Sequence, residues 1–238
     1  MFKNYLLTAC RSMLQHKTAT FISITGLALG VSCALLIFLY VQFELSYDNF
    51  HNNRISIYRV LVKGNPKHGD NSAKYHPATV YDLIPKLLEK YPSIGSAVRL
   101  SPQTAYLKHN EHLFEQDNFY FTDPSIFEIF DFPLQKGDRA NALKKPGSLV
   151  LSHEMAIKFF EGKNPVGQKM TMTIFNTRSF TFTITGVLEP IPKNSSLKID
   201  FLASENFGKL KQMLPDWMPL YTYSYIKFNW NKNYKLGY

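Results

Sequence analysis

The chain has 238 residues, of which 45% are hydrophobic and 19% are charged. These shares are close to those of globular proteins, so they exclude a chain that is disordered throughout and a membrane protein with many spans. The length is enough for one medium domain with its own core and a short appendage. The mean hydropathy of -0.18 hides an uneven distribution, because no charged residue lies between Lys17 and Glu44.

The net charge of +9 comes from 27 basic and 18 acidic residues. Apart from those near the N-terminus, the basic residues are scattered. A nucleic-acid-binding protein usually gathers Lys and Arg on one helix or stripe, so we expect no nucleic-acid partner. The two cysteines are Cys10 and Cys33. The chain after residue 43 therefore has no disulfide and no thiolate metal site.

The residues from Phe21 to Phe43 form an apolar run that is long enough to cross a bilayer. At about 1.5 Å per residue a helix over this run covers roughly 35 Å. We predict a transmembrane helix over residues 19–44. A cleaved signal peptide, or a lipoprotein signal that ends before Cys33, remains the alternative, although its apolar region usually has only about 7–15 residues. Residues 1–18 place apolar side chains at helical spacing, which predicts an amphipathic cytoplasmic segment on the lipid surface.

The charges on either side of this run differ in sign. Lys3, Arg11 and Lys17 precede the run, and Glu44 and Asp48 follow it. The positive-inside rule predicts a single-pass protein of the bacterial inner membrane, with a cytoplasmic N-terminus and a periplasmic main domain.

Small residues recur along one face of the predicted membrane helix. Gly26 and Gly30 are four residues apart, and Ser23 lies one turn earlier on nearly the same face. Small side chains let a second helix approach closely, so these three residues form a candidate helix-packing interface. Glycine is common in membrane helices in any case, and the motif alone is a weak signal.

Residues 45–238 mix helical and strand patterns. We predict strands over 55–62, 98–107, 113–121, 149–151, 169–175, 178–188, 197–202 and 221–228. We predict helices over 77–91, 124–130, 153–160 and 204–214, with Pro85 as a candidate kink in the first and Ser152 as the cap of the third. Gly186 should mark a bulge or a close backbone approach. The pattern is α+β, with no regular βαβ alternation and no constant repeat.

Enzyme motifs are missing from the sequence. The segment 162–169 is not a P-loop, and there is no GxSxG. Ser152, His153 and Glu154 are consecutive, so their side chains point in different directions and are not a triad. His109 and His112 would need further ligands to hold a metal, and we interpret them as solvated residues. We therefore expect no catalytic residue, no cofactor and no metal ligand.

Eight segments carry a family resemblance: residues 24–30 (ITGLALG), 46–51 (SYDNFH), 57–60 (IYRV), 150–156 (VLSHEMA), 159–160 (FF), 164–167 (NPVG), 184–188 (ITGVL) and 192–196 (PKNSS). Each is weak alone, but their order and spacing run through nearly the whole chain. Together they resemble the MacB-like periplasmic core domain of ABC transporter permeases, the family with FtsX-type membrane domains. Within these segments we interpret the motif residues as core residues of the outer domain. Tyr47 and Phe50, just past the membrane helix, would also suit an interface or the base of the domain, and we favour the core interpretation for both.

The resemblance implies a two-lobed mixed α/β extracytoplasmic domain over residues 45–238. It also implies a permease subunit, or an N-terminal fragment of one, that transmits ATP-driven motion for export, lipoprotein release or cell-envelope processes. A separate cytoplasmic ATPase, other permease helices or a second copy would be partners, with a peptide, lipoprotein or small molecule as cargo. Complete members have further membrane helices after the outer domain, so a truncated gene, a fragment and a split subunit remain open. A stand-alone membrane-anchored binding or sensor domain is the alternative function.

Overall fold

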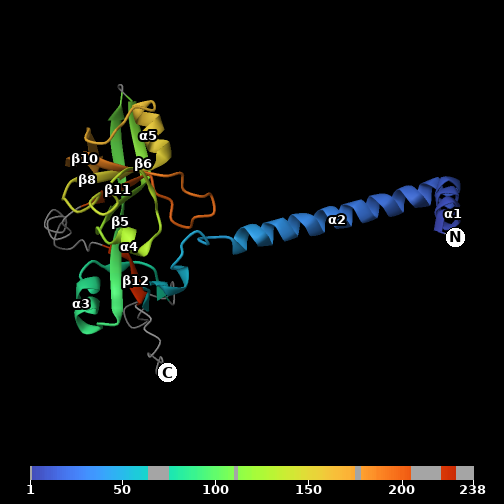
Figure 1. Cartoon of the computed structure of the whole chain (residues 1–238), viewed down its shortest axis with the longest axis horizontal. Helices are drawn as coiled ribbons and strands as arrows, with labels where there is room; N and C mark the ends of the chain where they lie inside the picture. Colours follow the sequence, from blue (N-terminus) through green and yellow to red (C-terminus); the bar gives the residue numbers. More distant parts are fainter. Residues whose placement is uncertain (1, 64–74, 110–111, 175–177, 205–220, 229–238) are drawn as a thin grey trace, which may run out of the picture. The chain divides into compact units, whose positions relative to one another are not determined.

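The computed structural model describes residues 2–63, 75–109, 112–174, 178–204 and 221–228 (Figure 1). The chain divides into two compact units, Met1–Tyr47 and Asp48–Tyr238. The first is helical, and the second, which we call the outer domain, is built around one large mixed sheet.

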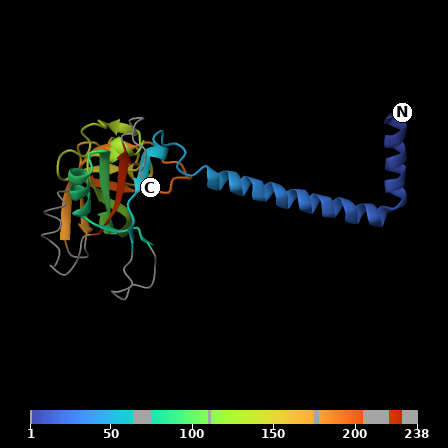
Figure 2. The same cartoon turned by 90° about the horizontal axis from the view of Figure 1, so that it is seen from below.

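The first unit contains helices α1 (Phe2–Gln15) and α2 (Lys17–Leu45), so both predicted helices are confirmed as helices. Figure 2 shows α2 as one uninterrupted helix. It is long and apolar enough to cross a membrane, with a mean hydropathy of 2.4 in its most apolar window, and none of its residues is buried. The hydroxyls of Thr25 and Ser32 donate to the carbonyls of Phe21 and Ala28, each at 2.7 Å. These bonds satisfy the hydroxyls within the helix, as a lipid environment requires.

The outer domain has a ten-stranded sheet in the order β1-β12-β5-β6-β11-β8-β10-β7, with β4 beside β12 and β9 beside β10 and β5. The strands are β1 (Ile57–Arg59), β4 (Thr79–Val80), β5 (Ile94–His109), β6 (His112–Thr122), β7 (Leu134–Gly137), β8 (Ser148–Leu151), β9 (Lys169–Ile174), β10 (Arg178–Leu188), β11 (Phe201–Ser204) and β12 (Tyr221–Phe228). A separate pair joins β2 (Val62–Lys63) and β3 (Tyr75–His76). The β10–β8 and β11–β6 pairs are parallel, and the other pairs are antiparallel.

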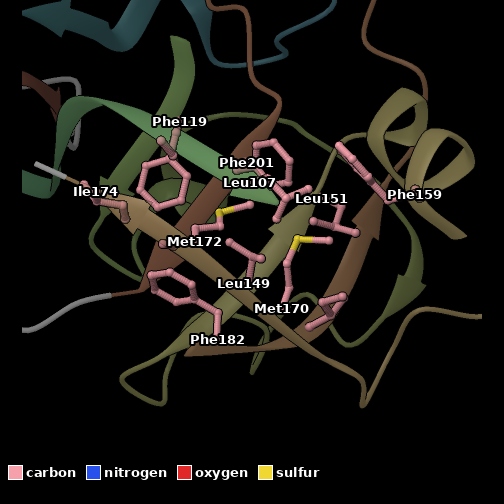
Figure 3. Close-up of a cluster of buried hydrophobic side chains, with 14 of the residues drawn as sticks. Leu107, Phe119, Leu149, Leu151, Phe159, Met170, Met172, Ile174, Phe182 and Phe201 are labelled. Carbon is pink, nitrogen blue, oxygen red and sulfur yellow. The ribbon is translucent and has the colours of Figure 1, made fainter. Parts of the chain in front are cut away.

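Six of these strands close into a small barrel. The pairings run from β5 to β6, β11, β8, β10 and β9, and β9 pairs again with β5. Alternate residues of each strand point inward, as closure requires. The side chains that fill the interior, which we call the barrel core, include Leu107, Phe119, Phe121, Leu149, Leu151, Met172, Ile174, Phe182 and Phe201 (Figure 3). Helix α5 (His153–Phe160) adds Ala156 and Phe159 to the same core.

A second apolar cluster covers the outside of the same strands. Val150 and Leu202 belong to this cluster, whereas their strand neighbours face the barrel core, so β8 and β11 are buried on both faces. Helix α4 (Ile126–Ile129) supplies Ile126, Phe127 and Ile129 to it. A smaller cluster lies under α3 (Leu83–Lys90). Figure 1 shows α3 and α5 toward opposite ends of β5, so the domain has two lobes along one sheet.

Several local predictions are confirmed. The predicted strand 221–228 and helix 153–160 match β12 and α5. The amide of Met155 donates to Ser152 Oγ at 3.2 Å, so Ser152 is the N-cap of α5. At Gly186 the register with β8 shifts, and an added Cβ would lie 3.2 Å from the carbonyl oxygen of Lys136. Gly186 therefore marks both a bulge and a close approach.

The predicted helix 77–91 is wrong in its first half, because Thr79 and Val80 pair with β12 as β4. The helix begins at Leu83, which places Pro85 in the first turn. The amide hydrogens of a first turn have no partner within the helix, so proline costs no hydrogen bond there and no kink is needed. The predicted strand 55–62 is broken into a short 3₁₀ turn (Arg54–Ser56), β1 and β2.

Other differences lie between residues 130 and 214. Strand β7 was not predicted. Strand β11 begins at Phe201 rather than at Leu197, because Leu197 and Ile199 are buried from an irregular segment and not from a strand. Ser204 ends β11, and the rest of the predicted helix 204–214 lies outside the described residues.

Candidate functional site

The outer domain begins with residues Asp48–His51, which we call the anchor motif. Asp48 has a positive φ of 55°, a left-handed conformation that Asp adopts more readily than most residues. Its amide donates to the carbonyl of Asn194 at 3.0 Å. Its carboxylate accepts bonds from the amide of Ser196 at 2.9 Å and from the Ser196 hydroxyl. Charged acceptors make the stronger class of hydrogen bond, so Asp48 is held at three points.

The partners of Asp48 lie in the segment 189–200 between β10 and β11, which we call the strap. The hydroxyl of Ser195 is buried and donates to the carbonyl of Leu197 at 3.0 Å. Leu197 and Ile199 pack in the second apolar cluster. At its end, Asp200 donates its amide to the Asn118 carbonyl at 3.0 Å. The strap is therefore fixed to the sheet although it has no strand or helix of its own.

His51 is the second fixed point of the anchor motif. Its ring is only 4% exposed and lies 4.0 Å from the ring of Phe50, 5.3 Å from Phe130 and 5.2 Å from Phe132. Its Nδ1 accepts a bond from the amide of Asp131 at 3.0 Å. Burial lowers the pKa of His51, while the carboxylates of Asp48 and Asp131 act in the opposite direction. The ring is thus a neutral acceptor inside an aromatic cage.

The residues on either side of the boundary between Tyr47 and Asp48 are hydrogen-bonded within their own units. The amides of Ser46 and Tyr47 bond back to Phe43 and Glu44 of α2 at 3.0 and 3.4 Å, and the next amide, that of Asp48, bonds to the strap. Phe50 packs against the second apolar cluster, so its predicted core role is confirmed. For Tyr47 that prediction is wrong, because its ring is 39% exposed and meets Phe43 edge to face, outside the domain core.

The predicted helix-packing residues Ser23, Gly26 and Gly30 lie along α2 and are all exposed. A Cβ added at either glycine would meet no atom within 4 Å. The structure of this single chain does not bring them against another element, so a helix-packing role stays a prediction.

Among the residues that the structure describes, no group of three His, Cys, Asp or Glu side chains is arranged to hold a metal. His109 and His112 are register partners at the end of the β5–β6 pair. Ser152 caps α5, and His153 and Glu154 lie in its first turn.

The sequence did not show that the anchor motif and the strap meet. Both belong to segments that carry the family resemblance, yet Asp48 and Ser196 are 148 positions apart. Both segments are short and polar and have no helix or strand periodicity. The only signal in the sequence was their turn chemistry, which predicts a local bend and says nothing about a distant partner.

Comparison with known proteins agrees with this fold. The family model described as the MacB-like periplasmic core domain matches residues 20–224. A domain assigned to a permease protein of Porphyromonas gingivalis is 21% identical, with a TM-score of 0.56 over 75% of each chain. The periplasmic region of MacB from Actinobacillus actinomycetemcomitans is 15% identical, with a TM-score of 0.52 over 76% of this chain and 80% of that one.

A third structure is the extracellular domain of the noncanonical ABC-type transporter YknZ from Gram-positive bacteria. It is 13% identical, with a TM-score of 0.51 over 74% of this chain and 85% of that one. At these identities the structures show a shared fold and nothing finer. No curated protein matches the chain. The family match covers most of the sequence, and the chain belongs to the MacB-like periplasmic core domain family.

Proposed function

We propose that this chain is a permease subunit of an ABC transporter, or the N-terminal part of one, whose outer domain transmits ATP-driven motion. The motion would serve export, lipoprotein release or another cell-envelope process. The observation that carries the proposal is the family match over residues 20–224, which spans the apolar helix and most of the outer domain. Asp48, the first residue of the outer domain, is held to the strap by three hydrogen bonds, so a pull transmitted along the chain would reach the strap at this residue.

The strap gives the displacement a route into the domain. It connects β10 to β11, two strands of the barrel. Asp48 holds the middle of the strap, and Asp131, which precedes the buried Phe132, holds His51. Packed elements move as bodies rather than deform continuously, so a pull on the strap should shift the barrel as a unit.

The remaining partners follow from the membrane helix. We place the N-terminus in the cytoplasm by the positive-inside rule and the outer domain in the periplasm. ATP hydrolysis would belong to a separate cytoplasmic ATPase. Ser23, Gly26 and Gly30 would pack against further permease helices or a second copy. Peptides, lipoproteins or small molecules remain the candidate cargo.

A stand-alone membrane-anchored binding or sensor domain is the second candidate. A cavity of about 390 Å³ between the strap, Asn118 and Glu154 favours it, because a sensor needs a ligand site in its outer domain. A sensor would have no ATPase partner.

Co-purification separates the two candidates. We would tag the chain near its N-terminus, crosslink cells, purify in detergent and identify partners by mass spectrometry. The permease proposal expects an ABC ATPase in the eluate. Replacing Gly26 and Gly30 by Leu should reduce recovery of partner membrane proteins, while Ala28→Leu, on another face of the helix, should not. Recovery of the intact membrane protein with no ATPase would contradict the permease proposal.

A second experiment tests transmission itself. With Cys10 and Cys33 replaced by Ser, spin labels can be placed at Gln42 and Thr181, which are both exposed. If the helix end and the barrel move together, ATP should leave the distance between these labels in the purified complex unchanged and narrowly distributed. A Gly-Ser insertion between Tyr47 and Asp48 should broaden the distance distribution and make it depend on ATP, and the same insertion between Lys144 and Lys145 should not. A narrow, ATP-independent distance after the first insertion would show that the anchor motif does not transmit motion.

A further inference from the structure

Helix α5 separates two cavities of different charge. One is the cavity of about 390 Å³ beside the strap, which we call the strap cavity. It is lined by Glu154 and Asp200 together with Lys193 and Lys198, so its charges are mixed. The other cavity, of about 220 Å³, lies between α5, β7 and the turn that follows α5. Its polar lining consists of Gln135, Lys136, His153 and Lys163, and no Asp or Glu lines it. We call it the basic cavity.

The polar groups of the basic cavity are positioned by the fold. Lys136 lies in β7 as the register partner of Val187 and is half-buried. The ring of His153 is oriented by a 3.1 Å contact between its Nδ1 and Oε1 of Gln135. Because the amide oxygen only accepts, Nδ1 carries the hydrogen and Nε2 is left for another partner. Lys163 follows the left-handed turn that ends α5, and its amide donates to the Phe160 carbonyl at 2.8 Å.

The positive charge of this cavity is not neutralised by nearby acids. Among the described residues, neither Lys136 nor Lys163 is in ion-pair distance of a carboxylate. Glu154 is adjacent to His153 in sequence but about 100° further round the helix, and it lines the strap cavity instead. Two lysines without an acidic partner at a cavity attract an anion more strongly than two lysines on a flat surface, because the low-dielectric walls focus the field.

We propose that the basic cavity binds an oxyanion, the carboxylate or phosphate group of a ligand. Lys136 and Lys163 supply the charge, and the side-chain NH2 group of Gln135, whose oxygen faces His153, is a hydrogen-bond donor for the bound oxygens. The apolar remainder of the lining, Ala156, Ile157, Pro165 and Val187, fits a short carbon segment next to that group. The volume is smaller than that of a typical drug-sized pocket, so the cavity takes one anionic group and not a whole large molecule. This inference does not depend on the proposed transport function.

The test uses the full chain in phosphatidylcholine nanodiscs, with histidine rings labelled with ¹³C. Sodium phosphate and sodium acetate are the probes, at an ionic strength held constant with sodium chloride. The ring signal of His153 is assigned by its loss in His153→Gln. We expect this signal to shift in a saturable way with phosphate, acetate or both. In the double variant Lys136→Gln/Lys163→Gln binding should be weaker, with a Kd at least about tenfold higher.

The matched control is Lys193→Gln/Lys198→Gln, which removes the same charge from the strap cavity and should keep the Kd within about twofold. If the first double variant does not fold, Lys163→Gln alone replaces it, since Lys163 is exposed. A shift without added anion in nanodiscs that contain phosphatidylglycerol would identify a lipid headgroup as the source of the phosphate. No saturable shift with any probe, or equal weakening in both double variants, would overturn the proposal.

Discussion

The barrel core and the anchor motif are held together by opposite kinds of interaction. The barrel core is filled by Phe, Leu, Ile and Met side chains that bury apolar surface from every side. The anchor motif depends on a few directional bonds, from Asp48 to the strap and from His51 to Asp131. Apolar burial is not directional and is shared among many contacts, whereas a bond to one carboxylate is lost when that carboxylate is changed. Mutations should therefore separate stability from motion.

The largest loss of stability should come from Phe201→Ala in the barrel core. Phe201 is fully buried, and its ring centre is 6.3 Å from that of Phe119. Truncating a buried phenylalanine leaves a cavity and costs about 3–5 kcal/mol of unfolding free energy. Urea unfolding of the detergent-solubilised chain, followed by circular dichroism, measures it. Phe201→Leu should cost less than half as much. An alanine variant that loses under about 1 kcal/mol would contradict a packed barrel.

Asp48 should show the next largest loss, with a larger effect on motion than on stability. Asp48→Ala removes two bonds to a charged acceptor and places alanine at a positive φ, which together cost about 1–3 kcal/mol. The urea midpoint measures that cost, and an ATP-dependent spin-label distance between positions 42 and 181 would report the loss of coupling.

Two further variants separate the backbone and charge contributions to the effect of Asp48→Ala. Asp48→Gly removes the same bonds but suits the positive φ, so its difference from alanine reports the backbone strain. Asp48→Asn tolerates the conformation and keeps one acceptor oxygen, so it reports the charge. If all three variants keep a narrow, ATP-independent distance, the barrel is coupled to the membrane helix by another route.

The buried His51 should make the free energy of unfolding depend on pH, whereas the apolar side chains of the barrel core do not titrate. Burial lowers its pKa in the folded state below the ordinary value of 6.5. The unfolded chain then binds more protons between the two values, so stability is complete above pH 6.5 and falls as the pH drops toward the folded-state pKa. For one proton, the free energy of unfolding changes by at most about 1.4 kcal/mol per pH unit.

Urea midpoints between pH 5 and pH 8 measure the contribution of His51. The variant His51→Gln keeps an acceptor for the Asp131 amide but does not titrate, so its stability should fall less on acidification. His153→Gln is the matched control, because it removes a histidine that lies outside the aromatic cage. An equal acid loss in wild type and His51→Gln would show that His51 does not carry the effect.

The sequence predicted the elements whose signals are local. The alternation in residues 221–228, the Thr- and Phe-rich hairpin of β9 and β10, and the cap at Ser152 each depend on neighbours within a few positions. The closure of the barrel depends on β9 meeting β5, which no local pattern encodes. The pairing of Asp48 with Ser196 was missed for the same reason. Asp48 was interpreted only as a charge that follows the apolar run and as part of a family segment, and Ser196 only as part of a family segment, because a single polar side chain does not indicate a distant partner.

The smallest expected effect is the loss of the N-cap of α5, and it should destabilise this helix without destabilising the barrel. Ser152 accepts the amide of Met155 at 3.2 Å, and Ser152→Ala should cost about 1 kcal/mol, the usual value for a lost N-cap. Ala156 and Phe159 of α5 lie in the barrel core, so the helix should stay docked while its first turn loosens. Hydrogen exchange of the amides of residues 153–156 should therefore accelerate, with exchange in β8 and β11 unchanged.

Ser152→Asp, which restores a capping acceptor at the positive end of the helix, should recover the protection. Faster exchange across β8 and β11 as well would mean that α5 and the barrel unfold as one unit, and that the cap contributes to the stability of the barrel.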